Sequence, residues 1–99
     1  MAKEIKWTKT AQKNFIKTVD YLIENWPDKV VSEFITHTDY TLQLLAIHPD
    51  LGILQNREKD IRGILLTPHN KLFYRIAKNQ LIVLRIFDTR QNPRKLKFK

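Results

Sequence analysis

The sequence contains no cysteine and only two glycines among its 99 residues. The missing cysteines exclude disulfides, thiolate metal sites and a cysteine nucleophile, and they fit a protein of the reducing cytoplasm. Two glycines, Gly52 and Gly63, are too few for a glycine-rich loop that holds a phosphate. The one serine, Ser32, falls within a predicted helix, so a serine-hydrolase site is not expected.

Long apolar runs are also missing from the chain. No stretch approaches the roughly 20 residues that a membrane span needs. The N-terminus alternates charged and apolar residues, unlike a signal peptide. The length suits one domain, and a hydrophobic content of 42% argues against disorder. We therefore expect a single soluble domain, residues 1–99, in the cytoplasm and without a membrane partner.

Negative charge is scarce in the second half of the chain. Residues 1–50 carry six Lys and Arg against seven Asp and Glu, whereas residues 51–99 carry twelve against three. The net charge of +8 therefore comes from the second half, and this asymmetry predicts a polyanionic partner. A basic tail without acids, at about residues 90–99, ends the sequence and includes Arg94 and Lys95.

The first half predicts a short strand at residues 5–7 followed by a helical hairpin. Thr8 can cap a first helix over residues 11–26, and Pro27 ends it. A second helix runs from about Pro27 to Ile47, and the proline and glycine of residues 48–52 stop it. Apolar residues spaced by three and four form the stripes of both helices. The stripes consist of Ala11, Phe15, Val19, Leu22, Ile23 and Trp26, and of Val31, Phe34, Ile35, Thr38, Leu42 and Leu45.

The second half changes to the two-residue period of strands. After a polar connection at residues 53–60, three strands are predicted at Ile61–Thr67, Lys71–Ala77 and Gln80–Asp88. Their short connections indicate antiparallel hairpins. Both faces of the last strand are apolar, which is typical of a central strand. The predicted fold is α+β: an N-terminal strand, a two-helix hairpin and three antiparallel strands, with the helices packed on one sheet face.

The arginines of these strands are the most informative candidates for binding. A charge buried without a partner costs several kcal/mol, so each arginine must reach solvent, a carboxylate or a phosphate. Arg75 and Arg90, near strand ends with Arg62 and Lys71 close by, predict a phosphate-binding groove, because guanidinium forks bind phosphate bidentately. For Arg85 an internal ion pair weighs slightly more than phosphate binding.

Two residues are candidates for moving protons. Glu58 precedes the first basic strand and could act as a general base, although such an acid more often balances neighbouring cations. His69 lies in a loop beside the basic sheet and could donate or accept a proton, as histidine side chains often do, with an ordinary turn residue as the alternative. The three histidines have no metal-ligand spacing, so neither a metal nor another cofactor is expected.

Segments along nearly the whole chain are similar, in order and spacing, to those of one family. IKWTKTAQKNF resembles its first strand and the entry to its first helix, and LLAIHPDLG resembles the exit from its second helix. IRGILL and KLFYRI resemble the middle strands, and QLIVLRIFDTRQNP resembles the last strand with an arginine-bearing turn. The family is the RelE/ParE toxin superfamily of bacterial type II toxin–antitoxin systems.

This resemblance implies a toxin held inactive by a cognate antitoxin, whose acidic segment would cover the basic sheet. RelE-like members cut messenger RNA on the ribosome without metal, while the ribose 2′-hydroxyl attacks the adjacent phosphate. Such an enzyme must orient the RNA and stabilise charge. By position, Arg62, Arg75 and Arg90 match the family's basic residues, and Lys71 matches more loosely. The nucleic-acid contacts implied in addition are Lys71, Arg85, Arg94 and Lys95.

The sequence departs from the nuclease pattern after the last strand. RelE-like nucleases commonly place a Tyr or His there, and residues 88–95 contain neither. The position before Asp88, often His in relatives, is Phe87. ParE-like members, which inhibit DNA gyrase, do not need such a residue. Three interpretations therefore stay open. The first, narrowly favoured, is an mRNA endoribonuclease, with Glu58 or His69 moving protons. The second is a gyrase inhibitor without nuclease activity, and the third is a basic domain that only binds nucleic acid.

Overall fold

The computed structural model describes residues 2–90, and its elements follow the predicted order. The elements are β1 (Glu4–Trp7), α1 (Lys9–Asn25), α2 (Asp28–Ile47), the 3-10 helix η1 (Pro49–Leu51), β2 (Ile53–Asn56), β3 (Ile61–Thr67), β4 (Asn70–Ala77) and β5 (Gln80–Asp88). The strands form one sheet in the order β1-β5-β4-β3-β2. β1 runs parallel to β5, and the other pairs are antiparallel. The predicted α+β architecture is confirmed, and β5, the last strand among the described residues, lies in the interior of the sheet.

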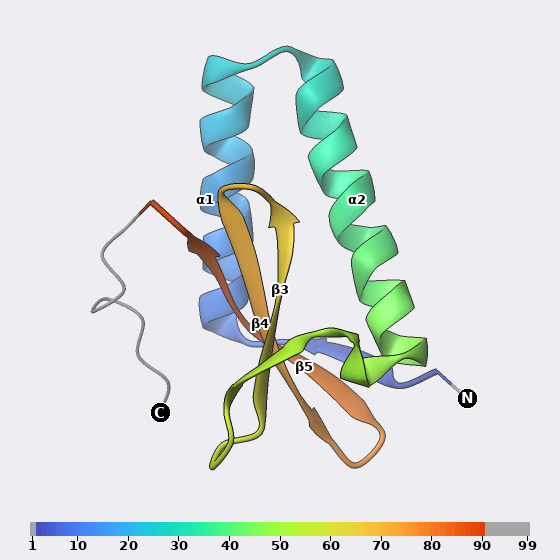
Figure 1. Ribbon diagram of the computed structural model, residues 1–99. Coiled ribbons are helices and arrows are strands. Elements are labelled where there is room, and N and C mark those ends of the chain that lie inside the picture. The colour runs from blue at the N-terminus through green and yellow to red at the C-terminus, as the bar shows by residue number, and fades with distance from the viewer. Residues whose placement is uncertain (1, 91–99) are drawn as a thin grey trace.

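Helices α1 and α2 stand side by side against one face of the sheet, and their far ends extend beyond the β3–β4 turn (Figure 1). The predicted cap fixes where this hairpin begins. The Thr8 hydroxyl accepts the N–H of Ala11 at 3.1 Å and donates to the Val83 carbonyl at 3.0 Å. One side chain therefore satisfies an open helix end and joins α1 to β5.

The main core lies between the helices and the sheet. Its buried residues include Phe34, Leu42 and Leu45 of α2 and Leu72, Tyr74, Leu81 and Val83 of the central strands. Burying one aliphatic side chain of this size contributes about 1.5–3 kcal/mol. The hydrophobic layer thus holds the helical hairpin against the sheet, as the helix and strand periods predicted.

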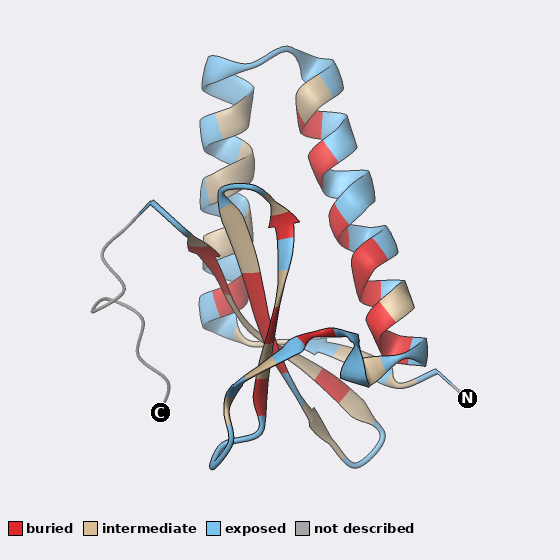
Figure 2. Ribbon diagram, in the orientation of Figure 1, coloured by how far each residue is buried: buried red, intermediate tan, exposed pale blue. Residues whose placement is uncertain are grey.

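Part of the predicted helical stripe is not buried. Ala11 is the one residue of α1 that is fully buried. Ile23, Trp26 and Ile35 belonged to the predicted stripes, yet they are 57%, 53% and 42% exposed. The reason is geometric, because the hairpin outruns the sheet that would cover it (Figure 2). The far end of the hairpin therefore presents apolar side chains to solvent.

A short edge strand occupies part of the segment that the sequence indicated as a polar connection. β2 pairs with the start of β3, and the register shifts between Leu54 and Asn56. Its first residue, Ile53, is 72% exposed. Four residues, half of them polar, are too few to produce a recognisable alternation. The sheet consequently has five strands.

Candidate functional site

β4 carries two of the predicted cations, Lys71 and Arg75, on one face of the sheet. Successive strand residues point to opposite faces, and Leu72 and Tyr74 belong to the core under the helices. Lys71, Phe73 and Arg75 therefore point to the other face, which no helix among residues 2–90 covers. We call this the open face.

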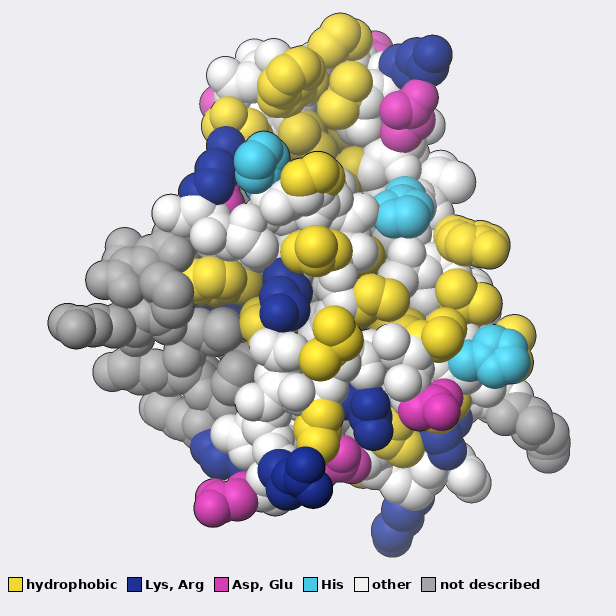
Figure 3. Space-filling model, viewed as in Figure 1, with side chains coloured by type: hydrophobic (Ala, Val, Ile, Leu, Met, Phe, Trp, Pro, Cys, Tyr) yellow, Lys and Arg dark blue, Asp and Glu magenta, His cyan; other side chains and the backbone are white. Residues whose placement is uncertain are grey.

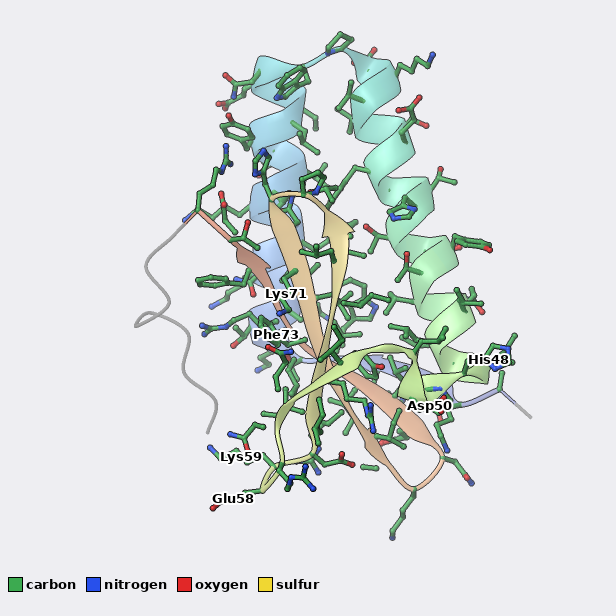
Figure 4. The ribbon with its side chains drawn as sticks, viewed as in Figure 1. His48, Asp50, Glu58, Lys59, Lys71 and Phe73 are labelled. Carbon is green, nitrogen blue, oxygen red and sulfur yellow. The ribbon has the colours of Figure 1, made fainter. Side chains whose placement is uncertain are left out.

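The ammonium group of Lys71 is positioned by three strands (Figure 4). Its Nζ donates to Gln55 Oε1 of β2 at 3.1 Å and lies 5.5 Å from the centre of the Phe73 ring. Gly63 of β3 leaves room for the lysine stem, because a Cβ there would come within 2.8 Å of Lys71 Cε. The combined hydrogen bond and ring contact hold this cation in one place.

The open-face cations form separate spots and not a continuous patch. Arg75 is exposed and lies opposite Ile61 and Ile82 in the register. Arg85 lies opposite Phe73 in β5 and is partly buried. In Figure 3, apolar and neutral side chains separate the basic ones on the viewed side. The described part of this face can contact an anion at several points, each with one or two cations.

Arg62 lies on the opposite, helix-facing side of the sheet. It pairs in register with Tyr74, and its Nη1 donates to the Gly52 carbonyl at 2.8 Å and to the Asp50 carbonyl at 3.5 Å. The Tyr74 hydroxyl accepts the Gly52 N–H at 2.9 Å and donates to the Pro49 carbonyl at 2.6 Å. Burial raises the pKa of Tyr74. Arg62 thus bonds the segment that follows α2 to the helix-facing side of the sheet, and it is not part of the open face.

Arg90 is engaged in a fork with a carboxylate at the end of β5. Its Nε and Nη2 donate to the two Asp88 oxygens at 3.0 and 2.8 Å, and its backbone N–H donates to Oδ1 at 2.9 Å. The side-chain hydrogen bonds from Arg90 hold the pKa of Asp88 below its usual range. The guanidinium group of Arg90, which was predicted to bind phosphate, therefore binds the carboxylate of Asp88.

The two acid–base candidates lie at opposite ends of β3. Glu58 is exposed in the β2–β3 loop before the strand begins (Figure 4). His69 is exposed in the β3–β4 turn after the strand ends. Seven strand residues at about 3.3 Å each separate these ends by roughly 20 Å. One ribose-phosphate cannot contact both side chains. Arg94 and Lys95 lie outside the described residues.

A second site, which the sequence did not indicate, opens between the far end of the helical hairpin and the end of the sheet. We call it the hairpin cleft; its volume is about 930 Å³. Its lining includes Tyr21, Leu22, Trp26, Val30 and Phe34 from the helices and Thr67, His69, Asn70, Asp88 and Arg90 from the sheet end. The cleft depends on where the strands stop relative to the helices, which no local pattern reports. One sign was present in Tyr21, an aromatic residue outside the predicted stripe.

The chemistry available at these sites is binding by cations and by apolar contact. Across residues 2–90, no group of three or more His, Asp or Glu side chains could hold a metal ion. No helix in that range is long and apolar enough to cross a membrane. The open face suits anionic groups, and the hairpin cleft suits an apolar one.

Solved structures of toxins share this fold. A ParDE toxin–antitoxin system from P. aeruginosa matches with a TM-score of 0.71 and 15% identity, over 88% of this chain and 96% of that one. The RelBE2 complex from Mycobacterium tuberculosis matches with a TM-score of 0.61 and 17% identity, over 89% and 99%. The DinJ–YafQ complex from E. coli matches with 0.60 and 16%, over 89% and 93%. At these identities the likeness establishes the fold.

The family follows from the sequence itself. No curated protein matches the chain. A family model does match, described as the ParE toxin of the type II toxin–antitoxin system parDE, and it spans residues 5–93. Because the match covers almost the whole chain, this protein belongs to the ParE toxin family of type II toxin–antitoxin systems, within the RelE/ParE superfamily.

Proposed function

We propose that this toxin acts by binding DNA gyrase and does not itself cut messenger RNA. The observation that carries the proposal is the separation of the three matched arginines. Electrostatic catalysis at a phosphate needs cations that converge on one point. Arg62 is bound to backbone carbonyls, Arg90 is bound to Asp88, and Arg75 stands alone on the open face among the three. The sequence alone narrowly favoured a nuclease. Because the three arginines are apart, we favour the gyrase inhibitor.

The acid–base candidates support the same proposal. Transfer of a proton from the 2′-hydroxyl and to the leaving oxygen requires groups within hydrogen-bond reach of one phosphate. Glu58 and His69 lie at the two ends of β3. A toxin that does not cut RNA needs neither residue as an acid or a base. Its open face can then serve as a contact surface for gyrase.

Lys71 and Arg75 are the residues expected to make that contact. Both belong to β4, and both point to the open face. Cations on a rigid strand can meet an acidic protein surface with little loss of side-chain freedom, and they raise the rate of encounter. The gyrase-binding surface should therefore include β4.

A nuclease is the second candidate, and one observation favours it. Lys71 is already held in place by Gln55 and Phe73, as expected of a group that must stabilise charge without moving. Arg75 lies four residues further along β4 on the same face, roughly 13 Å away. These two cations could hold two phosphates of an RNA strand.

Two assays on the purified toxin distinguish the candidates. We expect the wild-type protein to block gyrase supercoiling and to leave messenger RNA intact in cell-free translation. Arg75→Ala and Lys71→Ala should each weaken supercoiling inhibition by roughly tenfold, the loss typical of a charged contact. Lys29→Ala, which removes a highly exposed cation from α2, is the matched control and should change little. Codon-linked cleavage that Arg75→Ala abolishes would establish the nuclease and overturn the gyrase proposal.

A further inference from the structure

The side of α2 that points away from the core carries exposed apolar residues. Tyr40 and Ile47 are 63% and 59% exposed, and Leu44 lies between them on the same side of the helix. Leu51 of η1, which follows α2, is 50% exposed. We call these four residues the α2 flank, and we infer that it joins two copies of this chain into a weak, reversible dimer.

Helix α2 has a second apolar side besides the one in the core. Tyr40, Leu44 and Ile47 are separated by four and three positions, which places them in one line along the helix. Leu42 and Leu45 point the other way and are buried in the main core. In Figure 3 hydrophobic side chains gather over the lower half of α2 at the right edge of the view, with no Lys or Arg among them. A helix that is apolar on two sides is expected to bury both.

Positive charge is missing from this part of the sequence. Residues 30–56 contain no Lys or Arg, although the chain has 18 of them and a net charge of +8. The acids of this segment are Glu33, Asp39 and Asp50. Lys3 lies beside the end of α2, but its ammonium group donates to the Lys78 carbonyl at 3.1 Å. Two molecules that repel each other through their cations can therefore approach most closely at the α2 flank.

A second copy fits this surface better than a nucleic acid or an acidic protein does. A nucleic acid binds through cations, and the segment that carries the flank has none. An acidic protein, the partner expected from the net charge, would meet acids here and would find its cations on the open face. The four flank residues are uncharged, so two copies can meet there without facing like charges.

The size of the α2 flank suits a small interface. The exposed parts of its side chains come to roughly 400 Å², which is in the range of the largest apolar patch on a monomer. A twofold axis near Leu44 would pack the two α2 helices antiparallel, with Tyr40 of one copy near Ile47 of the other. With the polar residues around them, such a contact buries on the order of 1,200 Å² in total, the lower limit for a specific interface. We therefore expect a dissociation constant on the order of 10 µM.

Two isoleucines of nearly equal exposure test the inference. Ile47 belongs to the flank, whereas Ile16 of α1 is 58% exposed and lies outside it. Sedimentation velocity of the isolated toxin, from about 1 to 500 µM, should show a monomer–dimer equilibrium. Ile47→Gln keeps the net charge and should weaken self-association at least about tenfold, because it puts a polar side chain into an apolar contact. Ile16→Gln should stay within about twofold of the wild type, and circular dichroism should show that both variants fold.

A second measurement uses the absence of cysteine from the chain. A thiol introduced by Leu44→Cys, near the expected axis, can form a protein disulfide only with another molecule. Under oxidising conditions this variant should form a linked dimer at least about tenfold faster than Ile16→Cys. Self-association of the wild type should also strengthen when sodium chloride rises from about 0.05 to 0.5 M, because salt screens the repulsion between two basic copies and leaves apolar contacts in place.

Three results would overturn the inference. The first is a wild-type toxin that stays monomeric at about 500 µM. The second is an equal loss of self-association in Ile16→Gln and Ile47→Gln, which would place the contact elsewhere. The third is a monomeric wild type whose gyrase inhibition or antitoxin binding is weakened by Ile47→Gln, which would assign the flank to that protein.

The inference does not rest on the proposed function. The α2 flank and the open face lie on opposite sides of the sheet, since the main core separates α2 from β4. Ile47→Gln should therefore inhibit gyrase as strongly as the wild type does. A failure of the dimer leaves that activity to be judged by Arg75→Ala, and a failure of gyrase inhibition leaves the dimer to be judged by sedimentation.

Discussion

Tyr74 shows how one polar group inside the core determines where α2 ends. Its hydroxyl bonds to both Gly52 and Pro49, and its ring fills the space beside Gly52, where a Cβ would collide with the hydroxyl. Arg62 adds a further bond to the Gly52 carbonyl. An arginine expected to bind phosphate therefore works as a structural clamp, because its strand position faces the helices.

Removal of this hydroxyl should destabilise the fold. Tyr74→Phe leaves the buried Gly52 N–H and the Pro49 carbonyl without their partner, which costs about 1–3 kcal/mol. Urea unfolding followed by circular dichroism measures the change. Tyr40→Phe, at an exposed position of α2, is the control and should change the free energy of unfolding by less than about 0.5 kcal/mol. Equal stability of Tyr74→Phe and wild type would show that water replaces both bonds.

The Asp88–Arg90 fork predicts a pH dependence of stability. The pKa of Asp88 is lowered in the folded state, so the folded protein prefers the ionised form. Its contribution is complete above the unfolded pKa of about 3.9 and is lost as the pH falls through the lower folded pKa. Urea midpoints measured from about pH 6 to pH 2 should fall more steeply for wild type than for Asp88→Asn. Asp39→Asn, an exposed α2 substitution, should keep the wild-type slope.

At the scale of elements, the start of α1 depends on a single residue. Thr8 bonds to Ala11 in its own helix and to the carbonyls of Val83 and Leu84 in β5. We expect Thr8→Ala to cost about 1–2 kcal/mol, at the upper end for a helix cap, because the link to β5 is lost as well. Thr8→Ser keeps the hydroxyl and should recover most of the loss in the same urea experiment. A loss as large in Thr8→Ser would assign the effect to the methyl group.

The β4–β5 turn contains a residue that is poorly suited to its backbone. Lys78 has a φ of 56°. Its neighbour Asn79 would tolerate a positive φ better, because asparagine adopts left-handed backbone conformations more readily than lysine. Lys78→Gly should stabilise the protein by about 0.5–1 kcal/mol, because glycine adopts this conformation without strain. The melting temperature checks the sign. Lys13→Gly, at an exposed position inside helix α1, is the opposite control and should destabilise by about 1 kcal/mol.

At the scale of the whole molecule, the unbalanced charge should limit the stability of the isolated toxin. A net charge of +8 on 99 residues repels itself in the compact state. The melting temperature should therefore rise when sodium chloride increases from about 0.01 to 0.15 M, as the screening length falls from about 30 to 8 Å. The same increase in salt should raise it less in the antitoxin complex if the antitoxin supplies the compensating acids. An unchanged melting temperature in the isolated toxin would mean that local ion pairs already balance the charge.

The sequence by itself determined the order of the two helices and of every strand except β2, the caps of the helices and most of the main core. Thr8, Pro27 and residues 48–52 bound the helices through local backbone chemistry, and the alternation of β4 assigns Lys71 and Arg75 to one face. These features depend on residues close together in the chain, so a single sequence reports them. The charge asymmetry and the family resemblance can likewise be read from the sequence alone.

Only the tertiary structure decided which cations meet and which apolar residues stay uncovered. Arg62 faces the helices because β3 and β4 pair in the register that sets it opposite Tyr74. Trp26 stays exposed because the sheet ends before the hairpin does. Both outcomes depend on register and on where elements stop relative to one another. These relations join residues far apart in the sequence, and the local periodicity of the chain does not encode them.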